Sequence, residues 1–187
     1  MQEFYYTYIP ETDSFALDGY KGDEAAVVIP STQANKPVTM VFDNAFRGHT
    51  EIVSVKFPDD VHFIGSYVFD GCTNLRSVEL PANLETLYQY AFARCGIEEI
   101  VLPEKTRYLP FGAFKDCKNL RKVVCNDALA EISAHAFDGC NQLTEVVNSP
   151  DDTSPLSARI VTSIQPDHHA ETPYGKNRFA RKTAENQ

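Results

Sequence analysis

Apolar residues recur along the chain at an interval of about 23 positions. The clearest column is a set of phenylalanines with spacings of 23, 23, 22 and 23 residues: Phe46, Phe69, Phe92, Phe114 and Phe137. A small or modest apolar residue precedes each of them, and an aliphatic residue stands five positions earlier. A unit of this length is too small to bury its own apolar face, so the period predicts a solenoid of stacked units.

A second apolar set keeps the same register and has the form apolar-x-x-apolar-x-apolar. Its last three positions, as in Val78-Glu79-Leu80, alternate with period two, which predicts a short strand with one inward face. A proline that ends the strand follows in three units: Pro58, Pro81 and Pro103. The Ala-Phe half of each unit carries a turn such as Asp70-Gly71, and we expect an irregular return there with a turn or a short helix.

The segments IGSYVFDGCTNLRSVELPANLETLYQYAFARC and ISAHAFDGCNQLTEVV combine an Ile or Leu with Ala-Phe, Cys and Leu-x-x-Val-x-Leu-Pro. In this they resemble the BspA-like leucine-rich repeats, over roughly residues 25–149. The resemblance implies an α/β fold: a right-handed leucine-rich repeat solenoid with a short parallel β-sheet on its concave face and irregular or short-helical returns. It also implies a β-rich N-terminal cap.

The ends of the array depart from the pattern, as capping units do. We expect an N-terminal β cap and first strand over residues 1–30, the solenoid over 31–149, and a C-terminal cap with a polar, partly disordered tail over 150–187. Asn148 occupies a core column, which predicts that the stack ends there.

Two strands are predicted in the N-terminal cap, Phe4–Ile9 and Ser14–Tyr20, joined by a turn. The first solenoid strand is predicted at Val27–Ile29. The first unit, from Pro30 to Pro58, is predicted to carry an insertion of about five residues around Gln33–Pro37, since it exceeds the usual period.

Composition and charge narrow the classes of function. Hydrophobic residues make up 43% of the chain and charged residues 23%, which excludes a wholly disordered protein. The 17 basic and 26 acidic residues give a net charge of -9, which argues against binding to nucleic acid through phosphate neutralisation. There is no run of 18 apolar residues and no basic, apolar start, so we expect neither membrane insertion nor a signal peptide in this sequence.

Four of the five cysteines follow the repeat period: Cys72, Cys95, Cys117 and Cys140. No Cys-x-x-Cys pair occurs, so we interpret them, with Cys125, as reduced core residues and expect no metal or other cofactor. His49 replaces the ladder cysteine near the front of the array and is interpreted as a residue packed against the cap. A catalytic pair of Cys117 and His135 is conceivable, but no convergent catalytic set accompanies it, and we expect no enzyme activity.

The candidate ligand-binding residues are the outward positions of the predicted strands. They are Lys56, Ser77, Glu79, Glu99, Val101, Lys122, Val124, Glu145 and Val147. The three valines are expected to form an exposed patch, which favours either a contact site or simply the preference of β-branched residues for a sheet. With strands about 4.8 Å apart, the face offers about 250–300 Å², which is less than the roughly 800 Å² of a standard protein interface.

The leading hypothesis is therefore a non-enzymatic binding module for protein or cell-surface recognition, through the concave face and adjacent loops. Its partner is expected to be a protein or peptide, possibly a glycan, although the chain has no Trp. The alternative is a structural spacer or a repeat segment of a larger assembly. The family resemblance implies a cell-surface, adhesive or secreted protein, with a cytoplasmic one as the alternative, and the oligomeric state is left open.

Overall fold

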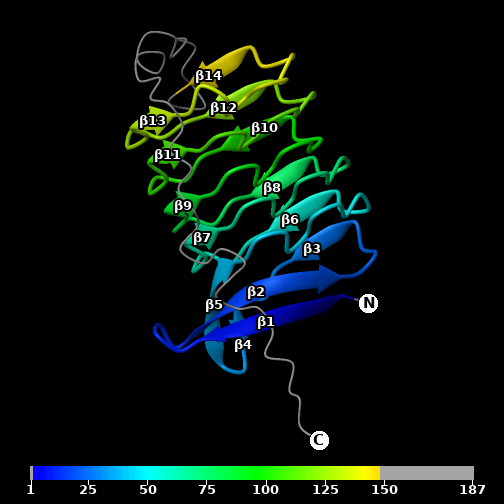
Figure 1. Ribbon diagram of the computed structural model, residues 1–187, viewed down its shortest axis with the longest axis vertical. Coiled ribbons are helices and arrows are strands. Elements are labelled where there is room, and N and C mark those ends of the chain that lie inside the picture. Colours follow the sequence, from blue (N-terminus) through cyan, green and yellow to red (C-terminus); the bar gives the residue numbers. More distant parts are fainter. Residues whose placement is uncertain (1, 148–187) are drawn as a thin grey trace, which may run out of the picture.

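The structure, a computed structural model, describes residues 2–147, which form a stack of coils on an N-terminal β cap (Figure 1). Two strands build the cap, β1 (Glu3–Ile9) and β2 (Ser14–Lys21), paired antiparallel. The predicted cap hairpin is thus confirmed. Strand β2 then pairs parallel with β5 (Lys36–Val41), so the cap and the solenoid share one sheet. Asn148 and the predicted C-terminal cap and tail over 150–187 lie outside the described residues.

Each coil contributes one strand to a main row. This row contains β3 (Ala26–Val28), β6 (Ser54–Lys56), β8 (Ser77–Glu79), β10 (Glu99–Val101), β12 (Lys122–Val124) and β14 (Glu145–Val147). Neighbours within its sheets are parallel and pair one period apart, as the alternation predicts. Successive side chains of a strand point to opposite faces. The middle residue of each strand therefore points inward, and the two residues beside it point outward.

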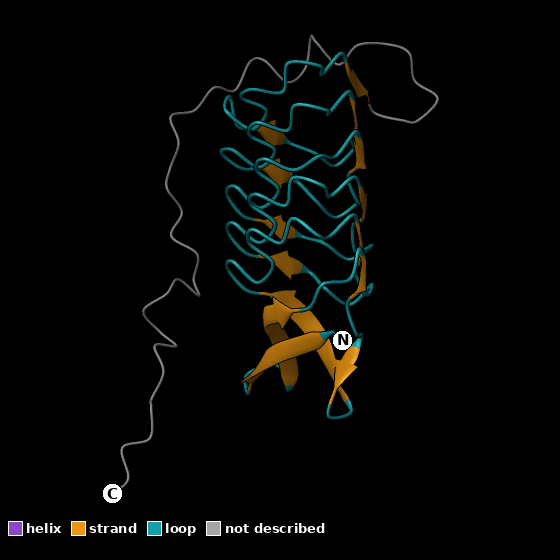
Figure 2. Cartoon of the chain, turned by 90° about the vertical axis from the view of Figure 1, so that its right-hand side faces the viewer, coloured by secondary structure: helices purple, strands orange, loops and turns teal. Residues whose placement is uncertain are grey.

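A short row of strands lies on another side of the coils (Figure 2). After β5 it contains β7 (Phe63–Ile64), β9 (Thr86–Leu87), β11 (Tyr108–Leu109) and β13 (Glu131–Ile132). The predicted insertion in the first unit is a β-hairpin, in which β4 (Thr32–Gln33) pairs antiparallel with β5. Its turn residues Ala34 and Asn35 have φ of 47° and 62°, the left-handed pair that a two-residue hairpin turn requires.

The returns contain no helix anywhere in residues 2–147, so the helical part of the predicted α/β class is wrong. The physical reason is a pair of left-handed backbone positions that flank the column phenylalanine in most coils. In the coil of Phe69 these are Tyr67 and Gly71, with φ of 59° and 82°. An α-helix needs an unbroken run of right-handed residues, and these positions interrupt it within four residues.

The phenylalanine column forms the centre of the core, as predicted. Successive rings stack nearly parallel, with centroid distances of 4.8, 5.4, 5.7 and 5.7 Å from Phe46 to Phe137. Phe46, Phe69, Phe92 and Phe114 are fully buried. The first distance equals the usual spacing of neighbouring strands, because one period advances the chain by one strand.

One coil interrupts both rows of strands. The main row divides into two three-stranded sheets, β3-β6-β8 and β10-β12-β14, and the short row divides between β9 and β11. Both divisions fall at the unit that has 22 residues instead of 23. Strand pairing is thus interrupted where one residue is missing, whereas return-side hydrogen bonds such as that from the Phe69 N–H to the Ala91 carbonyl oxygen continue across this interface.

Candidate recognition surfaces

The nine candidate residues lie on the main row, in strands β6 to β14. Strand register brings Lys56 beside Glu79, with Nζ 2.9 Å from Oε2, and Lys122 beside Glu145, with a distance of 3.6 Å between the charged atoms. The hydrogen bond to Glu79 raises the pKa of Lys56. Ser77 and Glu99 belong to strands on either side of the division and therefore do not form a ladder pair.

The predicted patch of three exposed valines is wrong. Val101 is 53% exposed, whereas Val124 and Val147 are only 2% and 3% exposed. The register places the three side by side, as expected. Strand alternation fixes the side to which a side chain points, but it does not fix how much of that side chain its surroundings cover.

The cysteines form the predicted structural ladder. All five are free and buried. Four thiols each donate a hydrogen bond to the carbonyl oxygen of a column phenylalanine in the preceding coil, at 3.0 to 3.2 Å: Cys72, Cys95, Cys117 and Cys140. Burial raises the pKa of Cys72 and Cys117 to about 12, and that of Cys125 and Cys140 to about 11.

These thiols are expected to resist alkylation in the folded protein. The thiolate is the reacting species, and raised pKa values leave very little of it near pH 8. Mass spectrometry after a short iodoacetamide pulse should find little label without denaturant and five labels per chain in urea. Rapid labelling of one cysteine in the native state would instead revive a catalytic role for it.

The two histidines singled out by the sequence have separate structural roles. His49 packs edge-on against Tyr20 of the cap, with ring centroids 5.1 Å apart, and its Nδ1 contacts Glu51, so the packing interpretation is confirmed. His135 Nδ1 lies 3.0 Å from Asp138 Oδ2, and its ring contacts Phe111. The Cys117 thiol is instead directed at the carbonyl oxygen of Phe92.

An ion cluster around a buried aspartate was not predicted from the sequence. The side chain of Asp70 is 1% exposed and lies between two arginines from neighbouring coils. Arg47 Nε is 3.1 Å from Asp70 Oδ2, and Arg94 Nη2 is 2.7 Å from the same oxygen. The spacing of these residues along the chain is a signal for the contact, because Asp70 is one period after Arg47 and about one before Arg94.

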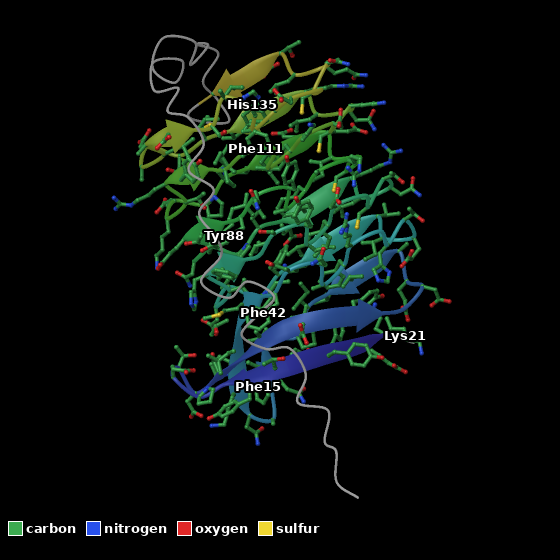
Figure 3. The ribbon with its side chains drawn as sticks, viewed as in Figure 1. Phe15, Lys21, Phe42, Tyr88, Phe111 and His135 are labelled. Atoms are coloured by element: carbon green, nitrogen blue, oxygen red, sulfur yellow. The ribbon has the colours of Figure 1, made fainter. Side chains whose placement is uncertain are left out.

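Aromatic side chains also align on the return side, two or three residues before the column phenylalanine. Tyr67 and Tyr90 stack at 4.9 Å, Tyr90 meets Phe111 at 5.4 Å, and Phe111 meets His135 at 5.1 Å. Figure 3 shows Phe111 and His135 in successive coils. The first contact is face to face and the other two are edge-on or tilted, and all three add packing between coils.

Among residues 2–147, no group of three or more His, Cys, Asp or Glu side chains is arranged to hold a metal ion. The same part of the chain contains no helix long and apolar enough to cross a bilayer.

Solved structures show the same fold. A leucine rich cell surface protein from Faecalibacterium prausnitzii A2-165 is 25% identical with a TM-score of 0.73, over 86% of this chain and 41% of that protein. The leucine-rich repeat protein of T. pallidum is 31% identical with a TM-score of 0.60, over 79% and 80% of the two chains. A leucine-rich repeat protein from Bacteroides capillosus is 21% identical with a TM-score of 0.53, over 78% and 94%.

The chain thus spans less than half of the F. prausnitzii protein. Among curated proteins, none matches it. A profile of the BspA type leucine rich repeat region matches residues 39–159 in six copies. This match agrees with the period of the phenylalanine column and with the parallel rows of strands. The chain therefore belongs to the BspA-type leucine-rich repeat family.

Proposed function

We propose that the protein is a non-enzymatic recognition module that binds a protein or cell-surface partner through the outward side of the main row and the adjacent loops. The supporting observation is the row of polar side chains that parallel strands hold at a fixed spacing over a packed core. Glu79 and Glu99 are exposed on it, and Val101 adds apolar surface. Proteins of this repeat family are generally protein-interaction modules.

The dimensions of the main row favour an extended partner. Strands of three residues, about 3.3 Å each, give a face near 10 Å wide, far smaller than one side of a standard interface. A peptide segment that lies across the strands fits such a face. The cell surface is the proposed compartment, because the F. prausnitzii relative is described as a cell surface protein.

A structural spacer is the second candidate. Both lysines of the face already pair with a carboxylate within it, Lys56 with Glu79 and Lys122 with Glu145. Ion pairs of this exposed kind contribute little to stability, and they also reduce the charge available to a partner. A spacer would tolerate charge reversal on this face.

The test compares three immobilised proteins as baits for surface extracts of the source cell and of its host. One is the wild type, one carries Glu79→Lys, Glu99→Lys and Val101→Asp on the main row, and one carries Glu85→Lys and Glu131→Lys at the short row. We expect a partner that the wild type and the short-row variant retain and the main-row variant loses. Circular dichroism confirms that all three are folded. Identical captures by the three baits, or none, would favour the spacer.

A further inference from the structure

One coil of the stack is a residue shorter than its neighbours at a single corner. In the two adjacent coils, two residues connect the ladder cysteine to the next core aliphatic residue, Thr73-Asn74 and Lys118-Asn119. In the short coil a single residue, Gly96, connects Cys95 to Ile97. A Cβ added to Gly96 would lie 2.6 Å from the carbonyl oxygen of Thr73. The short connection therefore lies directly on the backbone of the coil before it, and no side chain fits there.

The missing residue coincides with a recess of 490 Å³ on the surface, which we call the corner recess. Three successive coils line it, with Thr73 from the first, Arg94 and Gly96 from the short coil, and Asp116, Lys118 and Asn119 from the next. Its volume lies within the range of about 300–1,000 Å³ of small-ligand sites. A recess of this size accommodates one or two amino-acid side chains.

The corner recess presents a fixed cation. Asp70 accepts a hydrogen bond from Arg94 Nη2 at 2.7 Å, and the Arg94 side chain remains 55% exposed. Because a buried carboxylate already holds the guanidinium, a ligand would not have to order it, which reduces the entropy lost on binding. Asp70 offsets part of the charge of Arg94 but is shared with Arg47, and the exposed Lys118 adds a second positive charge against Asp116, the carboxylate in the lining.

Backbone conformation also distinguishes the lining of the recess. The position two residues after the column phenylalanine has a positive φ in all five coils. Glycine occupies it three times, at Gly48, Gly71 and Gly139, whereas Arg94 and Asp116 occupy it in the two coils that line the recess, with φ of 57° and 59°. A side chain in this conformation is disfavoured relative to glycine, because Cβ lies close to the following carbonyl oxygen. The two sites that depart from glycine thus both place a charged side chain in the recess.

We propose that the corner recess binds a carboxylate of an acidic peptide segment, as a subsite of the recognition function proposed above. Arg94 donates charge-assisted hydrogen bonds to the carboxylate, and Lys118 supplies a mobile point charge. Thr73 and Asn119 provide neutral donors at the rim. The lining contains no aromatic ring on which a sugar would stack, which favours a peptide over an acidic glycan.

The position of the recess fits a peptide that continues along the main row. Lys118-Asn119 precedes strand β12 by two residues, and Gly96 precedes β10 by the same number. A segment anchored by its carboxylate in the recess therefore reaches the outward side of these strands within a few residues. The recess and the main row then act as one surface.

The test uses the full chain labelled with ¹⁵N and the probe acetyl-Glu-Glu-Glu-Glu-amide. We expect saturable shifts of the backbone amide signals near Gly96 and Lys118, with a Kd of about 1 mM, and none with the tetraglutamine analogue. Lys118→Glu should weaken binding about tenfold, the loss of about 1.4 kcal/mol. The matched control is Lys105→Glu, because Lys105 is also exposed but donates a hydrogen bond to Asn83 away from the recess, and this variant should bind the probe as the wild type does.

A second variant fills the recess instead of changing its charge. Inserting an asparagine between Gly96 and Ile97 restores the 23-residue period and should abolish binding in a protein whose circular dichroism is unchanged. Equal shifts in the wild type, the insertion variant and Lys118→Glu would overturn the proposal, as would the absence of saturable shifts. Binding of oligogalacturonate without binding of the glutamate peptide would assign the recess to acidic sugars. None of these results depends on the captured partner, so the recognition function is tested separately.

Discussion

Replacing Phe92 with alanine is expected to lower the free energy of unfolding by about 3–5 kcal/mol, as for other buried aromatic residues. The ring is fully buried and stacks between Phe69 and Phe114, at 5.4 and 5.7 Å. Its removal leaves a cavity in the middle of the column that stacked coils cannot close without shifting both neighbours. Urea denaturation followed by circular dichroism measures the change.

Phe137 is the matched control within the same column. It is only half-buried and has one column ring beside it, that of Phe114. Phe137→Ala should therefore lower the free energy of unfolding by less, about 1–2 kcal/mol. If the denaturation midpoint of Phe92→Ala stayed near that of the wild type, the phenylalanine column would not be the core of the solenoid.

The second large effect is expected at Asp70. Asp70→Ala removes a carboxylate that is 1% exposed and leaves Arg47 and Arg94 facing each other without it. Breaking a fully buried ion pair in this way lowers stability by about 3–5 kcal/mol. Because the two arginines are 48% and 55% exposed, water screens part of the repulsion, and we expect about 2–3 kcal/mol.

Asp138 occupies the same position in its coil and serves as the comparison for Asp70. Its carboxylate is half-exposed and pairs with His135. Asp138→Ala should change the free energy of unfolding by less than about 0.5 kcal/mol, in the same urea experiment. Equal losses for the two variants would show that Asp70 contributes through its position in the turn and not through the arginines.

The repeat itself was predictable because it depends on burial, and burial has a period. The phenylalanine column, the inward strand positions such as Val78 and the buried thiols all follow from apolar residues that recur one coil apart. The cap hairpin and the insertion were also predicted, because both interrupt that period. Each of these features can be recognised from the type of residue at single positions of the sequence.

The remaining features depend on relations between coils. The two left-handed positions that exclude a helix are occupied by tyrosine, arginine and aspartate as well as glycine, so residue type does not reveal them. The burial of Val124 depends on what covers it, which strand alternation does not determine. The corner recess had a signal in the sequence, the single spacing of 22 residues, but a missing residue does not show which side chains surround the gap.

The interruption of the two rows of strands also affects how the solenoid unfolds. In a repeat protein each coil is stabilised by its own folding and by the interfaces with its two neighbours, so its cooperativity depends on the weakest interface. Here one interface lacks the strand pairing that joins the others, between the sheet ending in β8 and the sheet beginning with β10. The coils on either side still share one continuous core and return-side hydrogen bonds such as that from the Phe69 N–H to the Ala91 carbonyl oxygen, so this interface is weaker than the others but intact. The omission of one residue at Gly96 thus marks the interface at which we expect the array to open first when it unfolds.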